Sequence, residues 1–154
     1  MRVEYINPFV ESAMSVLQTT VSSEVKRGAP KLSNSINHIM GVAIIVGLAG
    51  QVSGRVIIDM SQETALNIAS SMNGERLNTF DELVSATLTE LGNMITGNAV
   101  TKLHQLGFKF DLTPPALFMG DNLRITDAKI EALVVPLELT EGKIEINVAI
   151  KENY

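Results

Sequence analysis

Residues 79–106, TFDELVSATLTELGNMITGNAVTKLHQL, form the longest helical pattern in the chain, and the rest of the fold is read outward from them. Apolar residues recur every three or four positions, which predicts an amphipathic helix with one face toward the core. Thr79 and Glu82 are spaced as a capping box at its start, and Gly107 is predicted to stop it after His104 or Leu106. The predicted core face consists of Phe80, Val84, Leu88, Leu91, Ile95, Ala99 and Leu106.

The opposite face of this predicted helix carries a row of small and polar residues, Ala86, Glu90, Asn93 and Gly97. Glu90 and Asn93 are three residues apart, so their side chains are neighbours on the helix surface. Gly92 and Gly97 each destabilise the helix by roughly 1 kcal/mol relative to alanine. We interpret the two glycines as clearance that lets a partner protein bring its backbone close to the polar pair. A second interpretation stays open on the residues alone: Glu90 and Asn93 merely keep the surface wet.

The segments around the long helix alternate between helical and strand patterns. A first helix is predicted over residues 7–21, with Pro8 in its first turn, and a polar link over residues 22–35 follows it. A shorter helix is predicted after the N-cap Ser61, with its stop at Gly74. Strands are predicted over residues 39–50, 53–60, 108–112, 116–120, 129–139 and 142–150.

This order of elements predicts an α+β fold, a single domain over residues 1–154 with helices packed on a mostly antiparallel sheet. Two pseudo-equivalent halves are indicated, because each half opens with a helix and later presents a pair of strands. The second strand of each pair begins alike, with Gly54-Arg55-Val56 and Gly142-Lys143-Ile144. The first long strand is continuously apolar and is predicted to be buried on both faces, whereas the last alternates and is predicted to be buried on one. Pro136 predicts an edge or a bulge in the strand before it.

Composition removes several classes of function. The chain has a net charge of -5 and no cysteine, which argues against nucleic-acid and anionic-membrane binding and excludes disulfides and thiol chemistry. The longest apolar run, residues 40–50, is too short to cross a bilayer. A soluble, cytoplasmic protein is therefore expected. His38 and His104 lie on different predicted elements, so neither a zinc site nor a histidine-based triad is expected.

Two sequences, ELGNMITGNAV from Glu90 onward and the later DLTPPALF, resemble the CheC/CheX family of chemotaxis phosphatases. The family pattern is a serine or acid, three residues, Glu, two residues, Asn and, about twenty residues later, a proline. Glu90 and Asn93 match it, and Pro114-Pro115 follows at the expected interval. Ala86 departs from it, because it stands where the family has the serine or acid. The order of helices and strands extends the resemblance, a CheC-like fold, over essentially the whole chain.

The resemblance implies a phosphatase that hydrolyses the aspartyl phosphate of a response-regulator receiver domain such as CheY. Asn93 is then expected to position the attacking water and Glu90 to pair with the receiver's lysine. Magnesium is expected on the receiver, and no cofactor in this chain. Val16 and Thr19 of the first helix align with the Glu and Asn positions, so the chain resembles single-site CheX, and a homodimer is expected. Two alternatives stay open: a non-catalytic module that docks receiver or flagellar switch proteins, and a structural homo-oligomer.

Overall fold

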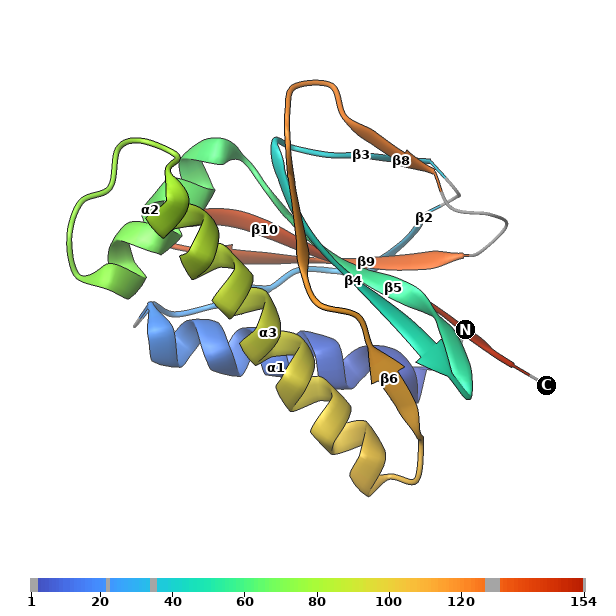
Figure 1. Ribbon diagram of the computed structural model, residues 1–154. Coiled ribbons are helices and arrows are strands. Elements are labelled where there is room, and N and C mark those ends of the chain that lie inside the picture. The colour runs from blue at the N-terminus through green and yellow to red at the C-terminus, as the bar shows by residue number, and fades with distance from the viewer. Residues whose placement is uncertain (1–2, 22, 34–35, 127–130, 154) are drawn as a thin grey trace.

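A computed structural model describes residues 3–21, 23–33, 36–126 and 131–153 of the chain (Figure 1). The described helices are α1 (Val3–Thr20), α2 (Gln62–Asn73) and α3 (Glu82–Gln105). The long strands form two hairpins, β4 (Val42–Gly50) with β5 (Val52–Met60), and β9 (Ala132–Leu139) with β10 (Gly142–Glu152). The short strands are β1 (Lys26–Arg27), β2 (Lys31–Ser33), β3 (Ile36–His38), β6 (Phe110–Leu112), β7 (Ala116–Met119) and β8 (Arg124–Thr126).

The main sheet is antiparallel at each pairing between described strands, and it joins the two hairpins in its centre. Its order is β1-β9-β10-β5-β4-β6, with β2 also paired to β9 and β7 also paired to β4. β5 and β10 pair along their lengths, from Ile144 opposite Met60 to Glu152 opposite Val52. Two hairpins side by side, with α1 packed against α3, give the arrangement predicted for two pseudo-equivalent halves. The predicted α+β architecture, with helices packed on a mostly antiparallel sheet, is confirmed.

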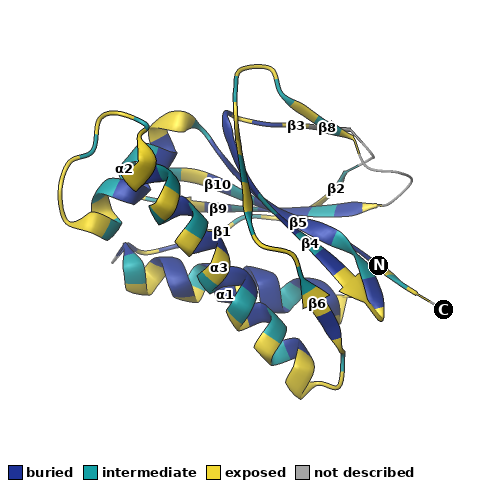
Figure 2. Cartoon of the chain, in the orientation of Figure 1, coloured by how far each residue is buried: buried dark blue, intermediate teal, exposed yellow. Residues whose placement is uncertain are grey.

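The core lies between the helices and one face of the sheet, and a smaller apolar cluster covers the other face (Figure 2). α1, α2 and α3 lie on the first side, and the two-stranded sheet β3–β8 lies on the second (Figure 1). β4 contributes to both layers, because Val42 and Ile44 face the helices while Ala43 belongs to the smaller cluster. The prediction that this strand is buried on both faces is therefore confirmed. Within the described part of the chain, none of the helices is long and apolar enough to span a membrane.

The first helix begins earlier than predicted. It starts at Val3 rather than at Asn7, which places Pro8 within the helix instead of in its first turn. Burial explains the extension, because Tyr5 and Ile6 both pack into the core. The Tyr5 ring meets Phe108 edge-on, with ring centroids 4.8 Å apart, and its hydroxyl donates a hydrogen bond to Glu152.

The long helix begins at Glu82, and its N-cap is Asp81 rather than the predicted Thr79. The Asp81 carboxylate accepts a hydrogen bond from the Val84 N–H at 3.1 Å, which satisfies one of the free donors of the first turn. The core face is confirmed for the residues inside the helix. Leu106 does not belong to it: this residue follows the last turn, and 63% of it is exposed. Phe80 precedes the helix and is half-buried.

Two of the strand predictions need correction, and the start of a third lies outside the described residues. The predicted polar link contains the short strands β1 and β2, which pair with β9 and remove the expected edge. Pro136 lies in the interval between them, where its missing N–H breaks no ladder, and its carbonyl accepts from the Gly28 N–H at 2.8 Å. On β10, Asn147 and Ala149 are buried rather than wet, because the smaller layer covers that face. The predicted strand 129–139 starts outside the described residues at Lys129 and Ile130; its described part begins at Ala132.

Candidate active site on helix α3

Contacts from neighbouring elements hold α3 in place from its first turn to its last. The Asn73 side chain, at the end of α2, donates to the Thr87 hydroxyl at 2.9 Å. Near the other end, the Lys102 ammonium lies 3.8 Å from the Glu11 carboxylate of α1. Leu91 and Ile95 are fully buried in the middle of the helix, which is where α3 contributes most to the core. Val84 and Leu103, near the two ends of the helix, are fully buried as well, so α3 packs on the core along its length and presents its other face outward.

Glu90 and Asn93 are both exposed on this outward face, where the sequence placed them. They stand one turn apart, so a carboxylate and a carboxamide project side by side toward solvent. Ala86 is exposed one turn before Glu90, and a Cβ built on Gly97 would meet no atom within 4 Å. The pair is thus flanked by small residues on both sides along the helix, and the described part of the chain does not cover it.

Gly92 has a different role from the one predicted. It is buried, and a Cβ at this position would lie 2.7 Å from Cγ2 of Ile44 on β4. Separations this short do not occur between packed carbon atoms, so a glycine is what allows α3 to approach the sheet so closely. The interpretation of Gly92 as clearance for a partner is wrong. Only Gly97 still fits the interpretation as clearance for a partner, because no atom of the described chain lies within 4 Å of a Cβ built there.

The proline pair of the family pattern, Pro114-Pro115, lies beside the centre of α3. A Cβ on Gly92 would be 3.7 Å from Cβ of Pro115, so the start of β7 runs alongside the turn between Glu90 and Asn93. Thr113 fixes this segment against β4. Its N–H donates to the Gly47 carbonyl at 2.9 Å, and its hydroxyl accepts from the Gly47 N–H at 2.7 Å. Residues far apart in the chain thereby meet around one short stretch of helix.

The chemistry available here is that of positioning groups. A carboxamide both donates and accepts hydrogen bonds and can orient a water molecule, while an exposed carboxylate can pair with a cation on another protein. Among the described residues, no group of three His, Cys, Asp or Glu side chains is close enough to hold a metal ion. Glu90 and Asn93 are thus suited to orienting a water molecule and to pairing with a cation on another protein.

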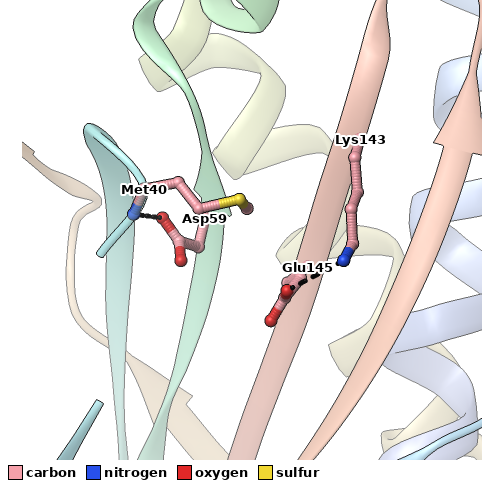
Figure 3. A network of polar contacts seen from close by, with 4 residues as sticks. All are labelled: Met40, Asp59, Lys143 and Glu145. Carbon is pink, nitrogen blue, oxygen red and sulfur yellow. Dashed lines mark hydrogen bonds and ion pairs between the residues drawn. The ribbon is translucent and has the colours of Figure 1, made fainter. Parts of the chain in front are cut away.

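A second conspicuous carboxylate, Asp59 on β5, lies on the face of the sheet away from the helices, because its register partner Ala43 belongs to the smaller cluster. Figure 3 shows Asp59 with Met40, Lys143 and Glu145. It is almost fully buried, and it accepts a hydrogen bond from the Met40 N–H at 3.0 Å. Burial raises the pKa of the Asp59 carboxyl to about 6, and the charge of Glu145, directly across the strand pair, adds to the effect. Glu145 is itself 3.4 Å from the Lys143 ammonium. The sheet separates Asp59 from α3, so this carboxyl bears on stability and its pH dependence rather than on the pair Glu90 and Asn93.

Comparison with known proteins decides the family. Residues 42–138, which include α3, Glu90, Asn93 and the proline pair, match the family of chemotaxis phosphatase CheX. The chain belongs to the CheX family. Over 98% of both chains, this CheX-family protein is 29% identical to the CheY-P phosphatase CheX of Thermotoga maritima. Its class of activity is accordingly that of a phosphatase, a hydrolase.

Solved structures agree with the family and extend over nearly the whole CheX-family chain. The match to the CheX–CheY–BeF3–Mg2+ complex from Borrelia burgdorferi has 49% identity and a TM-score of 0.85, and it covers 98% of this chain and 100% of that one. A CheC-like superfamily protein from a Shewanella species is 30% identical with a TM-score of 0.88, over 98% and 99% of the two chains. FliY of Thermotoga maritima is 18% identical with a TM-score of 0.66 and shares the fold.

One residue of the outward face escaped the sequence reasoning on this CheX-family chain. Leu83 is 43% exposed and lies seven residues before Glu90, two turns along the same side of α3. Residues seven positions apart lie on nearly the same line of a helix, so the sequence spacing already places Leu83 on the same side as Glu90. Leu83 does not stand out in the sequence, because single exposed apolar residues are common on protein surfaces.

Proposed function

We propose that this protein hydrolyses the aspartyl phosphate of a CheY-like receiver domain, with Asn93 positioning the attacking water and Glu90 docking the receiver. The observation that carries the proposal is the pair itself: both side chains are exposed on the outward face of α3, between the small residues Ala86 and Gly97. Because the residues on either side of the pair are small, the two side chains protrude and can enter the active site of another protein. The relatives named for CheY-P hydrolysis and for a complex with CheY support this choice of partner.

For this reaction, the chain needs to contribute little more than the orientation of the attacking water molecule. An acyl phosphate is already reactive, so the barrier falls when a water molecule is held in line with phosphorus and the leaving oxygen. The water oxygen forms a bond to phosphorus while the bond to the aspartate oxygen breaks. The aspartate carboxylate leaves with the electron pair, and a proton of the water passes to the phosphate product. Asn93 accepts one hydrogen bond from this water or donates one to it, which keeps a lone pair aimed at phosphorus.

Glu90 has an electrostatic role in this scheme. Its carboxylate pairs with a lysine of the receiver, which brings Asn93 into register and adds a charge-assisted hydrogen bond to the interface. Magnesium is a named component of the complex of the Borrelia burgdorferi relative, and we assign it to the receiver. There it would neutralise phosphate charge, while this chain contributes the carboxamide and the carboxylate.

Location and assembly are part of the proposal. We place the enzyme in the cytoplasm, where a receiver substrate works, and we expect a homodimer. The sheet supports a dimer, because β7 pairs only with β4 among the described strands and has no strand paired to its other edge. Such an edge can pair with a second copy of the chain.

Separating turnover from affinity tests the proposed roles. For Asn93→Ala, phosphate release at saturating phosphorylated CheY should fall by about 10²-fold or more, because one preorganised hydrogen-bonding group of the transition state is lost. Affinity for CheY carrying beryllofluoride should stay within about threefold. Glu90→Ala should lower both affinity and rate, and its effect should shrink as salt increases. Both variants should unfold like the wild type, since both side chains are exposed.

The same titration separates the alternatives. A non-catalytic docking module would bind beryllofluoride-loaded CheY without accelerating phosphate release from phosphorylated CheY. Ala86 supports this alternative, because it stands where the family pattern has a serine or an acid. Full activity of Asn93→Ala would overturn the water-positioning role.

A further inference from the structure

Leu83 belongs to the same row of α3 as the proposed catalytic pair. At 100° per residue, Leu83, Ala86, Glu90, Asn93 and Gly97 fall within about 80° of one another, opposite the core face. We call these five residues the docking row. Its N-terminal end is apolar, with Leu83 and Ala86 exposed, and its centre is polar. Leu83 is the one large apolar side chain of the row, and 43% of it faces solvent.

The geometry of the reaction brings any receiver over Leu83. Along the helix, Leu83 is about 13 Å from the point midway between Glu90 and Asn93, at 1.5 Å per residue. A specific protein interface covers roughly 800 Å² on each partner, which corresponds to a disc of about 16 Å radius. A receiver centred on the catalytic pair therefore extends over Leu83. It must either bury this side chain against an apolar group or leave it partly wet at the rim.

The backbone that carries Leu83 is held in place by hydrogen bonds on both sides of this residue. The Thr87 hydroxyl donates to the Leu83 carbonyl at 2.8 Å and accepts from the Asn73 side chain of α2 at 2.9 Å. Asp81 caps the same turn through its bond to the Val84 N–H. Because the backbone around Leu83 is already ordered, binding needs to order only the side chain itself and no segment of the chain.

We propose that Leu83 is an apolar anchor for the receiver domain, packing against an apolar side chain that the receiver presents beside its phosphorylated aspartate. This inference rests on the proposed function, since it takes the catalytic pair as the centre of the interface. Leu83 supplies affinity and partner selectivity, whereas Asn93 supplies rate. Selectivity follows because a receiver with a charged group at the facing position would bury that group against Leu83 without a partner.

The test compares Leu83→Ala with Leu106→Ala. Leu106 is a matched control, because it is also an exposed leucine at one end of α3 but lies outside the docking row. CheY of Borrelia burgdorferi is the probe, phosphorylated for turnover and loaded with beryllofluoride and magnesium for binding. Leu83→Ala should raise KM and Kd by about 5- to 30-fold, the range expected for truncating one apolar interface anchor. kcat should stay within about twofold, and Leu106→Ala should match the wild type in both.

The possible results distinguish failure of the Leu83 anchor from failure of the proposed phosphatase function. If Leu83→Ala leaves KM and Kd within twofold, or lowers kcat alone, the anchor is refuted while the phosphatase proposal stands. If the wild type binds loaded CheY but does not accelerate phosphate release, and Leu83→Ala still weakens binding, the anchor stands and the phosphatase proposal falls. A wild type that neither binds nor dephosphorylates this CheY refutes both for this receiver. Leu83→Gln, which retains size without an apolar surface, should behave like Leu83→Ala, and unchanged melting of all variants confirms that the fold is intact.

Discussion

Gly92→Ala is the substitution that best tests how packing and catalysis are joined in this protein. The new methyl group would lie 2.7 Å from Cγ2 of Ile44, about 0.7 Å closer than ordinary carbon contact begins. Ile44 is fully buried, and its strand is paired on both sides, with Ile58 of β5 and Leu117 of β7. The sheet cannot yield easily, so α3 must move outward by a similar amount.

Two effects on stability oppose each other. Overpacking a core by one methyl group destabilises by about 1–3 kcal/mol, while replacing glycine by alanine inside a helix stabilises by about 1 kcal/mol. We expect a net loss of about 0–2 kcal/mol in the free energy of unfolding. The effect on turnover should be larger. Glu90 and Asn93 flank Gly92, and a misplacement approaching 1 Å lowers a rate by up to about 10²-fold. A tenfold to hundredfold loss of kcat is therefore expected.

Gly97→Ala is the matched control on the same helix. A Cβ at Gly97 meets nothing within 4 Å, so this variant should gain up to about 1 kcal/mol of stability and keep its kcat. If the partner's backbone uses the open space, KM should rise. Denaturant midpoints and phosphate release at saturating phosphorylated CheY measure both properties. Equal stability and equal kcat of the two variants would refute the argument that Gly92 sets the position of the catalytic pair.

Two further predictions concern pH and assembly. The pKa of Asp59 is raised in the folded protein to about 6 from 3.8, so the stability that this carboxyl contributes is present below pH 4 and is lost as the pH rises through 6. Asp59→Asn removes this loss, and at pH 8 it should be about 2–3 kcal/mol more stable than the wild type, with the difference vanishing near pH 4; a difference that is independent of pH would contradict the assignment. Light scattering on a sizing column should give twice the chain mass of 16.7 kDa, and a single-chain mass at micromolar concentration would exclude the homodimer.

Much of the candidate site could be predicted from local sequence alone, because helical periodicity decides which residues share a face. The spacing of Leu88, Leu91 and Ile95 placed the core on one side of α3 and therefore Glu90 and Asn93 on the other. The family pattern then linked this pair to a proline about twenty residues later. Hairpin signals likewise placed β4 next to β5 and β9 next to β10. Each of these inferences depends on neighbours within a few residues or on a motif with fixed spacing.

Only the tertiary structure determines which segments cover the faces of these helices and strands. From the sequence alone, Gly92 only weakens the helix. In the structure, Ile44 and Pro115 lie beside it, and the glycine allows α3 to approach the sheet. The alternating pattern of the last strand predicts a solvent-exposed Asn147, but in the packed chain this side chain is buried. Nothing in the local sequence indicates that burial raises the pKa of Asp59. Periodicity specifies the direction of a side chain relative to its own element. Burial, close approach and pKa depend on which distant segment lies opposite, and only the packed chain determines that.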